Sequence, residues 1–279
     1  MRAFSYFILV VWSVVCALPL YWVLLASLKG EEAIVNGPRY LPFVDFTPNL
    51  DAWRFILFNS RENLLRPLYN SLVISAASTC IAIAAASLML YALSRCHSPS
   101  KAAPKLLLWA VLASRALPPA CFVFPLYMMA HTSGLLDTQR ALIITYSAVN
   151  LPVAVWLLLP VFGVRATEQE EAAVLDGASH LYVLWDILMP MIFSSVAAVA
   201  LIVFILGWNE YLFAAYLTTN HAATLTPWMV GQLSLKEAQI GGEPEEWAHL
   251  SAAAVLMVAP LLIFAGVVQK VLSRRSIGK

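Results

Sequence analysis

Long apolar runs alternate with short polar segments along most of this chain. Six of the runs are predicted as helices, because each reaches or exceeds the roughly 20 residues that cross a bilayer. They cover about 5–28, 67–94, 105–130, 141–161, 191–217 and 249–271. The pattern predicts an all-α, polytopic membrane protein with about six transmembrane helices. No linker is long enough to divide it, so we expect one transmembrane domain over 1–279, with its core at 67–271.

The first apolar run, Phe4 to Leu28, is too long for a signal peptide. An h-region has about 7–15 residues, so we interpret this run as an uncleaved first helix. The polar connection at 29–66 is expected to hold a short surface helix between Asn49 and Asn59, and 218–248 is expected to be a loop.

The composition agrees with a membrane protein. The chain is 61% hydrophobic and 12% charged, whereas soluble domains carry about 25% charge. A net charge of +1 provides no basic field for nucleic acid. We find no phosphate-binding loop, no metal-ligand spacing and no catalytic triad, so we expect no catalytic, metal or cofactor site on this chain.

The basic residues favour cytoplasmic termini, because cytoplasmic loops are enriched in Lys and Arg. Six spans put both ends of the chain on one side. The basic residues on that side are Arg2, Arg95, Lys101, Lys105, Arg165, Lys270, Arg274, Arg275 and Lys279. The polar segment around 162–190 lies on the same side, in the cytoplasm.

This segment is predicted to form two short helices, Glu168 to Asp176 and Leu181 to Met189. Gly177 stands where the first helix must end and the chain must turn. Pro190 marks the entry to the next apolar run.

The spacing in this segment resembles the EAA loop of the membrane-spanning subunits of binding-protein-dependent ABC importers. The residues that carry the resemblance are Glu171, Ala172, Ala173, Gly177, Ile187, Met189 and Pro190. Asp176-Gly177-Ala178 is the form seen in the carbohydrate branch. Met189 departs from the usual Leu, but that exchange preserves volume and apolarity.

The resemblance implies the type I ABC importer permease fold and a maltose-type carbohydrate importer of the bacterial inner membrane. In that family the loop is the coupling helix, which fits a cleft of the cytoplasmic ATPase. Glu171 would pair with a basic group there, and Gly177 would permit the sharp turn. The implied partners are a second related permease, two ATPase subunits that bind ATP and Mg, and an extracytoplasmic substrate-binding protein.

Polar side chains within the apolar runs are costly and suggest function. Trp208-Asn209-Glu210-Tyr211 follows Gly207, where the backbone could open. The amide and carboxylate could bond sugar hydroxyls while the rings stack on the sugar. The sequence is similar to the Trp-Asn-acidic motif of sugar permeases, which implies a substrate path here. Alternatively, Glu210 pairs with a cation of the partner subunit.

Arg115 is the second such residue, and it precedes Pro118, Pro119 and Pro125, which are expected to break the helix over 105–130. Freed carbonyls near prolines are tolerated where they face protein or a watery cavity. Arg115 therefore lines a cavity or gates it, or it snorkels at a helix end. An Arg115–Glu210 pair is compatible with the sequence.

Other functions stay open at this level. The importer could carry a polyol, glycerol phosphate or an amino acid. An ion-coupled secondary transporter could use Glu210 and Arg115, and a membrane scaffold would have no transport role.

Overall fold

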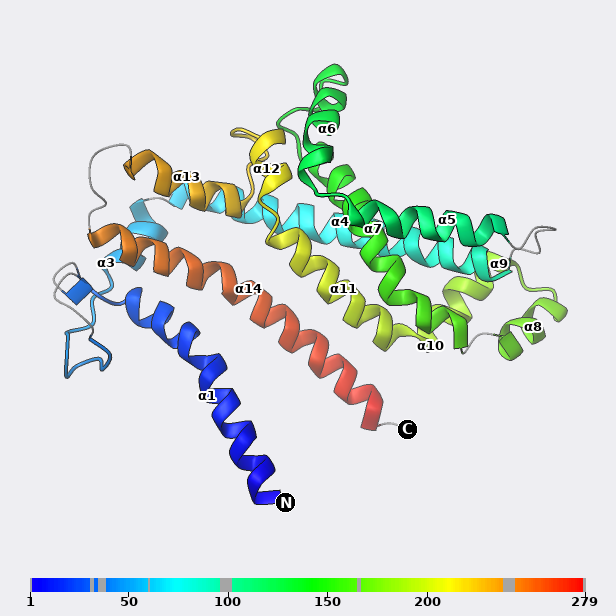
Figure 1. Ribbon diagram of the computed structural model, residues 1–279, viewed down its shortest axis with the longest axis horizontal. Helices are drawn as coiled ribbons and strands as arrows, with labels where there is room; N and C mark the ends of the chain where they lie inside the picture. The colour runs from blue at the N-terminus through cyan, green and yellow to red at the C-terminus, as the bar shows by residue number, and fades with distance from the viewer. Residues whose placement is uncertain are drawn as a thin grey trace. The chain divides into compact units, whose positions relative to one another are not determined.

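The computed structural model describes residues 2–30, 33–34, 39–59, 61–95, 102–164, 167–237 and 244–277. In these ranges the secondary structure is helical apart from an isolated bridge between Pro42 and Phe46, which confirms the predicted all-α class (Figure 1). The chain divides into two compact units. The first unit is Met1–Pro67 with Pro227–Ile263, and the second is Leu68–Thr226 with Phe264–Lys279.

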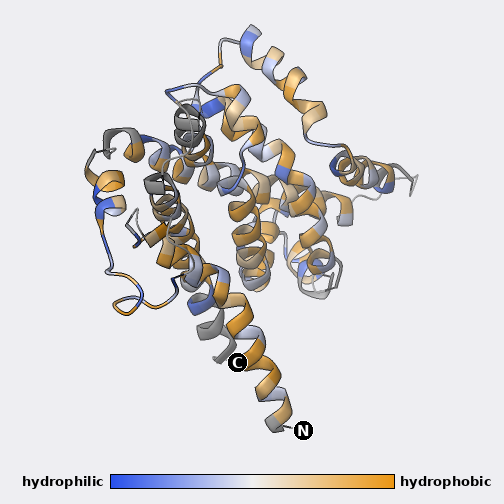
Figure 2. Cartoon of the chain, turned by 60° about the vertical axis from the view of Figure 1, so that its left-hand side comes forward, coloured by the Kyte–Doolittle hydropathy of each residue, from blue (hydrophilic) through white to orange (hydrophobic). Residues whose placement is uncertain are grey.

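The first unit is dominated by α1 (Arg2–Ala26), which is apolar along its length (Figure 2). Most of its large side chains are exposed, as expected of a helix that faces lipid. The short helix α3 (Asp51–Arg54) and the π-helical η1 (Phe55–Asn59) follow. They confirm the surface helix predicted between Asn49 and Asn59.

The second unit holds most of α4 (Arg61–Arg95) and all of the helices from α5 to α12. Those helices are α5 (Ala102–Ala113), η2 (Ser114–Ala116), α6 (Ala120–Thr132), α7 (Gln139–Val164), α8 (Thr167–Leu175), α9 (His180–Tyr182), η3 (Val183–Leu188), α10 (Met189–Met191), α11 (Phe193–Trp208) and α12 (Leu212–Leu217).

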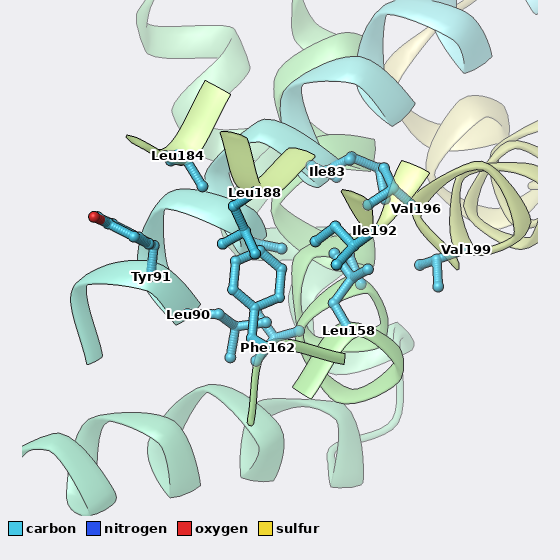
Figure 3. Packing of buried hydrophobic residues seen from close by; sticks show 14 of the residues in the cluster. Ile83, Leu90, Tyr91, Leu158, Phe162, Leu184, Leu188, Ile192, Val196 and Val199 are labelled. Carbon is cyan, nitrogen blue, oxygen red and sulfur yellow. The ribbon is translucent and has the colours of Figure 1, made fainter. Parts of the chain in front are cut away.

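One core of this unit joins α4, α7, α11 and η3 (Figure 3). Small residues on α4, such as Ala82 and Ala86, are fully buried and allow the helices to approach closely. Larger side chains fill the space around them, among them Leu90, Leu158, Phe162, Leu188 and Val199. The core therefore packs the segment after Gly177 directly against three long helices.

A second core surrounds Tyr146 on α7. It contains residues of α4, α6, α7 and α12, namely Ile74, Ala130, Leu142, Tyr146, Phe213, Ala214 and Leu217. This core fixes the position of α12, which follows the non-helical residues after α11.

Four described helices are long and apolar enough to cross a membrane, and up to six spans result if each bent pair is one span. The four are Phe4–Ala26, Leu64–Ser94, Gln139–Phe162 and Trp247–Lys270. The bent pairs are Lys105–Ala116 with Ala120–Thr132, at 101°, and His180–Met191 with Phe193–Trp208, at 86°.

The helix expected over 105–130 is interrupted at 117–119, which confirms the break expected at Pro118 and Pro119. The break expected at Pro125 is absent, because α6 continues through that residue. Leu117 is extended with a ψ of 137°, as expected before a proline. The amides of Cys121 and Phe122 then donate to the carbonyls of Pro118 and Pro119 and start α6.

The predicted helix over 191–217 is also interrupted. It ends at Trp208, and α12 begins at Leu212. The expected opening after Gly207 is therefore a break at 209–211.

The predicted loop at 218–248 contains helical structure. Helix α13 (Leu225–Glu237) begins within it, and α14 (Pro244–Ile277) starts at its proline. Proline is favoured in the first turn of a helix, so Pro244 suits this position. The hydropathy pattern missed α13 because that helix has no long apolar run.

Candidate coupling segment and substrate path

The segment 167–191, which we call the coupling segment, begins with α8. Two backbone hydrogen bonds end this helix. The Gly177 amide donates to the Val174 carbonyl and the Ala178 amide donates to the Ala173 carbonyl, both over 3.0 Å. These bonds are the Schellman arrangement that ends helices at a left-handed residue. The predicted short helix and its Gly corner are both present.

Gly177 has a φ of +89°, which L side chains rarely adopt. A Cβ added there would meet no atom within 4 Å. The backbone conformation, and not a lack of space, therefore favours glycine at this corner.

The carboxylates in α8 and directly after it lie in different surroundings. Glu170 is 3% exposed, whereas Glu171 and Asp176 are exposed. Ala173 and Ala178 pack partly against the core around Leu188, while Ala172 is exposed. One side of α8 thus faces its own chain, and Glu171 and Asp176 point outward.

Large apolar side chains are also exposed along the coupling segment. Leu175 is 87% exposed, and Leu181 and Tyr182 are more than half exposed. In contrast, Leu184 and Leu188 are completely or nearly completely buried. The segment is anchored by its second half and presents apolar surface at its corner.

The second half starts with the side chain of Ser179, which accepts a hydrogen bond from the Tyr182 amide. His180 Nδ1 lies 3.3 Å from the Tyr91 hydroxyl, and Tyr91 belongs to α4. The expected helix from Leu181 to Met189 is present as α9, η3 and α10, with π-helical turns in the middle. Pro190 is exposed within α10.

Residues 208–211, predicted to line the substrate path, lie at the break between α11 and α12 and differ in exposure. Trp208 is 1% exposed and stacks on Phe204, with 5.9 Å between the ring centroids. Asn209 is exposed, and its side-chain amide donates to the Ile205 carbonyl over 2.9 Å. Tyr211 is 42% exposed. Asn209 and Tyr211 therefore present surface, whereas Trp208 is a packing residue in this chain.

Glu210 caps α12. Its two carboxylate oxygens accept hydrogen bonds from the amides of Phe213, over 3.0 Å, and Ala214, over 3.2 Å. A carboxylate at a helix N-terminus satisfies amides that have no partner within the helix.

The buried hydroxyl of Tyr146 lies near both Glu210 and the buried hydroxyl of Thr224. Tyr146 interacts with the Glu210 carboxylate electrostatically. Sequence reasoning did not identify Tyr146, because a tyrosine in an apolar run carries no distinctive spacing.

Arg115 is exposed in the short turn η2. A cavity of about 200 Å³ lies beside it and is lined mostly by apolar side chains, including Pro119, Phe122, Leu126 and Pro152. Among the residues that the structure describes, no ion pair joins Arg115 to Glu210.

A hollow of about 380 Å³ lies between α6 and α12. Three of its lining residues are aromatic, Phe124, Tyr127 and Tyr216, and all three are exposed. Rings displayed in this way offer flat apolar faces to a ligand.

The loop between α6 and α7 contains a polar centre that the sequence analysis missed. The Asp137 carboxylate accepts hydrogen bonds from the amides of Thr219, Asn220, His221 and Ala222, and from the Thr219 hydroxyl. Burial raises the pKa of Asp137, but these amides lower it by more, so the pKa lies well below its usual range. We call Asp137 and residues 218–224 the Asp137 corner.

Comparison with known proteins identifies the family. The binding-protein-dependent transport system inner membrane component family matches residues 79–278. A probable ABC transporter permease protein, y4oR, of Sinorhizobium fredii is 32% identical, over 91% of this chain and 86% of its own. The trehalose/maltose transport system permease protein MalG of Thermococcus litoralis is 29% identical, over 92% of this chain and 88% of its own.

A solved structure has the same fold. It is a bacterial ABC transporter involved in the import of the acidic polysaccharide alginate, and one of its chains matches with a TM-score of 0.75. That match covers 96% of this chain and 95% of the other at 19% sequence identity. With the family match over residues 79–278, this chain belongs to the inner-membrane permease components of binding-protein-dependent ABC importers.

Proposed function

We propose that this chain is a permease subunit of an ATP-driven sugar importer and that the coupling segment docks on the cytoplasmic ATPase. The observation that carries the proposal is the exposure of Glu171 on α8 and of Asp176 directly after it, beside the apolar corner at Leu175. Two carboxylates and an apolar anchor on one rigid turn fit a cleft that offers a basic group and an apolar floor.

The proposed assembly contains this chain, a second related permease, two ATPase subunits with ATP and Mg, and an extracytoplasmic binding protein. The family description supports the binding protein, since transport in this family depends on one. We place both termini and the coupling segment in the cytoplasm of a bacterium, in agreement with the distribution of Lys and Arg.

In the proposed mechanism, ATP binding closes the ATPase pair and moves the coupling segment as a rigid body. Val183, Leu184 and Leu188 of η3 are buried in the core formed by α4, α7 and α11. Displacement of α8 would therefore tilt these helices and switch the cavity between its two faces.

A sugar is the proposed substrate. The trehalose/maltose relative supports this class, and so do the aromatic rings of the hollow between α6 and α12. We propose that Asn209 and Tyr211 contact the sugar and that Arg115 lines the path beside its cavity. Glu210 and Trp208 would shape the path by fixing the break, because one caps α12 and the other packs on Phe204.

An ion-coupled transporter receives less support from this arrangement. Such a transporter would need Glu210 free to exchange a proton or cation, whereas both of its oxygens are bonded to α12. A polyol, glycerol phosphate or amino acid would fit the same coupling machinery and stays an alternative substrate.

The test is co-purification of the chain in mild detergent with identification of its partners and assay of ATPase activity. We expect an ATPase subunit that is lost on Glu171→Arg, because the substitution puts a cation against a basic group. Asp51→Arg is the matched control, since Asp51 is an exposed carboxylate on α3 of the other unit. Equal recovery of the ATPase with both variants would contradict the proposal.

A further inference from the structure

The loop after α1 contains a compact turn whose tip is apolar. Leu41, Phe43 and Val44 are 55%, 85% and 78% exposed. Phe43 has a φ of +65°, which is unusual for a bulky residue. A turn that holds such a residue outward suggests that its tip has a partner.

The turn is held by its own hydrogen bonds and is therefore a defined shape. The Asp45 carboxylate accepts bonds from the amides of Tyr40 and Leu41, both 2.9 Å. The Phe43 amide donates to the Phe46 carbonyl over 2.9 Å, and the Phe46 side chain is buried. We call residues 40–46 the aromatic turn.

Contacts with α1 fix the depth of the aromatic turn. The Tyr21 hydroxyl donates to the Tyr40 carbonyl over 2.8 Å, and the rings of Trp22 and Tyr40 lie 5.4 Å apart. The membrane-spanning part of α1 runs from Phe4 to Ala26. Tyr40 therefore lies beside residues about one helical turn inside the end of the span, roughly 6 Å from it.

Lys29 contacts the rings of both α1 and the aromatic turn. Its Nζ lies 4.4 Å from the Trp22 ring centroid and 5.6 Å from that of Phe46. Burial lowers the pKa of Lys29, as does the nearby charge of Arg39, against the opposite effect of Asp45. Trp, Tyr and Lys gather in this manner at the boundary between lipid tails and headgroups.

We propose that the aromatic turn is a membrane anchor that inserts Leu41, Phe43 and Val44 into the headgroup region at the outer end of α1. Its partner is the lipid bilayer. A turn tethered to Tyr21 and Trp22 starts at the depth of the lipid headgroups, and an apolar tip at that depth is stabilised by lipid. The insertion sets the depth and tilt of α1 in the bilayer.

Spin labelling of the assembled importer in liposomes tests this proposal. The native residues Cys16, Cys80, Cys96 and Cys121 are first replaced by Ser. Single labels are then placed at Phe43→Cys and Val44→Cys, with Leu9→Cys inside the span and exposed Thr47→Cys as controls. Collision rates with oxygen, which partitions into lipid, are compared with those of a water-soluble nickel reagent.

We expect oxygen to dominate at Phe43→Cys and Val44→Cys, with a depth between those of Thr47→Cys and Leu9→Cys. Nickel access at the tip equal to that at Thr47→Cys, with no binding protein present, would overturn the proposal. A label that is accessible alone but is shielded and immobilised by added binding protein would overturn it too, because the turn would then be a protein-docking surface. Two tip positions are used so that a local distortion at one cannot decide the result.

Discussion

The coupling segment and the Asp137 corner lie in the same compact unit and use their carboxylates in opposite ways. At the corner, one carboxylate accepts bonds from four backbone amides and a hydroxyl of its own chain. In the coupling segment, Glu171 and Asp176 are exposed beside an apolar corner. Polar groups that are satisfied internally hold the fold, and those left exposed on a rigid turn are available to a partner.

Each of these two regions has a glycine with a positive φ in it or near it. Gly134, near the Asp137 corner, has a φ of +65°, and Gly177 has a φ of +89°. A Cβ added at either would meet no atom within 4 Å. Local strain from a side chain should therefore be alike at the two sites, and a difference in effect must come from the surroundings.

The largest expected effect follows from Gly177→Asp. A side chain in the left-handed region costs about 1–2 kcal/mol, and the added carboxylate alters the surface that docks on the ATPase. We expect sugar uptake to be lost while the chain still inserts in the membrane, as measured by uptake in cells and by membrane fractionation.

Gly134→Asp is the matched control for that variant. It introduces the same strain and the same charge at the other end of the unit, and we expect uptake to be largely kept. Equal loss of uptake in both variants would mean that strain alone is responsible.

The next effect in size is on stability, from Asp137→Ala. The substitution leaves the four amides of residues 219–222 without their carboxylate, which costs about 2 kcal/mol at a site that is partly exposed to water. Thermal unfolding of the purified complex should shift to lower temperature, and Asp137→Asn should recover part of the loss. A melting temperature equal to that of Asp51→Ala, an exposed carboxylate with few bonds, would contradict this role.

A smaller effect is expected in how the stability contributed by Asp137 depends on pH. The pKa of Asp137 in the folded chain lies below its ordinary value of 3.8, so its contribution to stability is fully present above that value. It declines as the pH falls below 3.8 towards the lowered pKa. The difference in melting temperature between the native chain and Asp137→Asn should therefore be constant from pH 8 to about 5 and shrink under stronger acid. A difference that grows on acidification would refute the assignment.

The smallest expected effect concerns the contact between Tyr91 and His180. A neutral hydrogen bond of 3.3 Å contributes about 0.5–1 kcal/mol. His180→Ala should slightly lower the sugar transported per ATP hydrolysed, and His180→Asn, which keeps an acceptor near Nδ1, should restore it. Adding Tyr91→Phe to His180→Ala should have no further effect if the two residues act through this bond.

Much of the fold could be predicted because long apolar runs directly reflect the thickness of a bilayer. The corner at Gly177 was also predictable, since its signals are local and lie within ten residues. The breaks in the predicted helices were harder to place. Prolines indicated the one at 117–119, but the end of α11 depends on Glu210 capping α12, which hydropathy does not describe.

The Asp137 corner could not be predicted from the sequence. Its partners lie at least 82 residues further along the chain, and backbone amides have no sequence signature. The exposure of Glu171 and the burial of Glu170 could not be predicted either. Which of two adjacent helix positions is buried depends on how α8 packs against the rest of the chain.

The separation of Asp137 from residues 219–222 also sets an order for biosynthesis. The carboxylate leaves the ribosome 82 to 85 residues before the amides that it binds. During that interval α7, the coupling segment and α11 must be made and inserted. The bonds of Asp137 can therefore form only after α12 and residues 219–222 have been made, so their completion depends on the placement of these later segments.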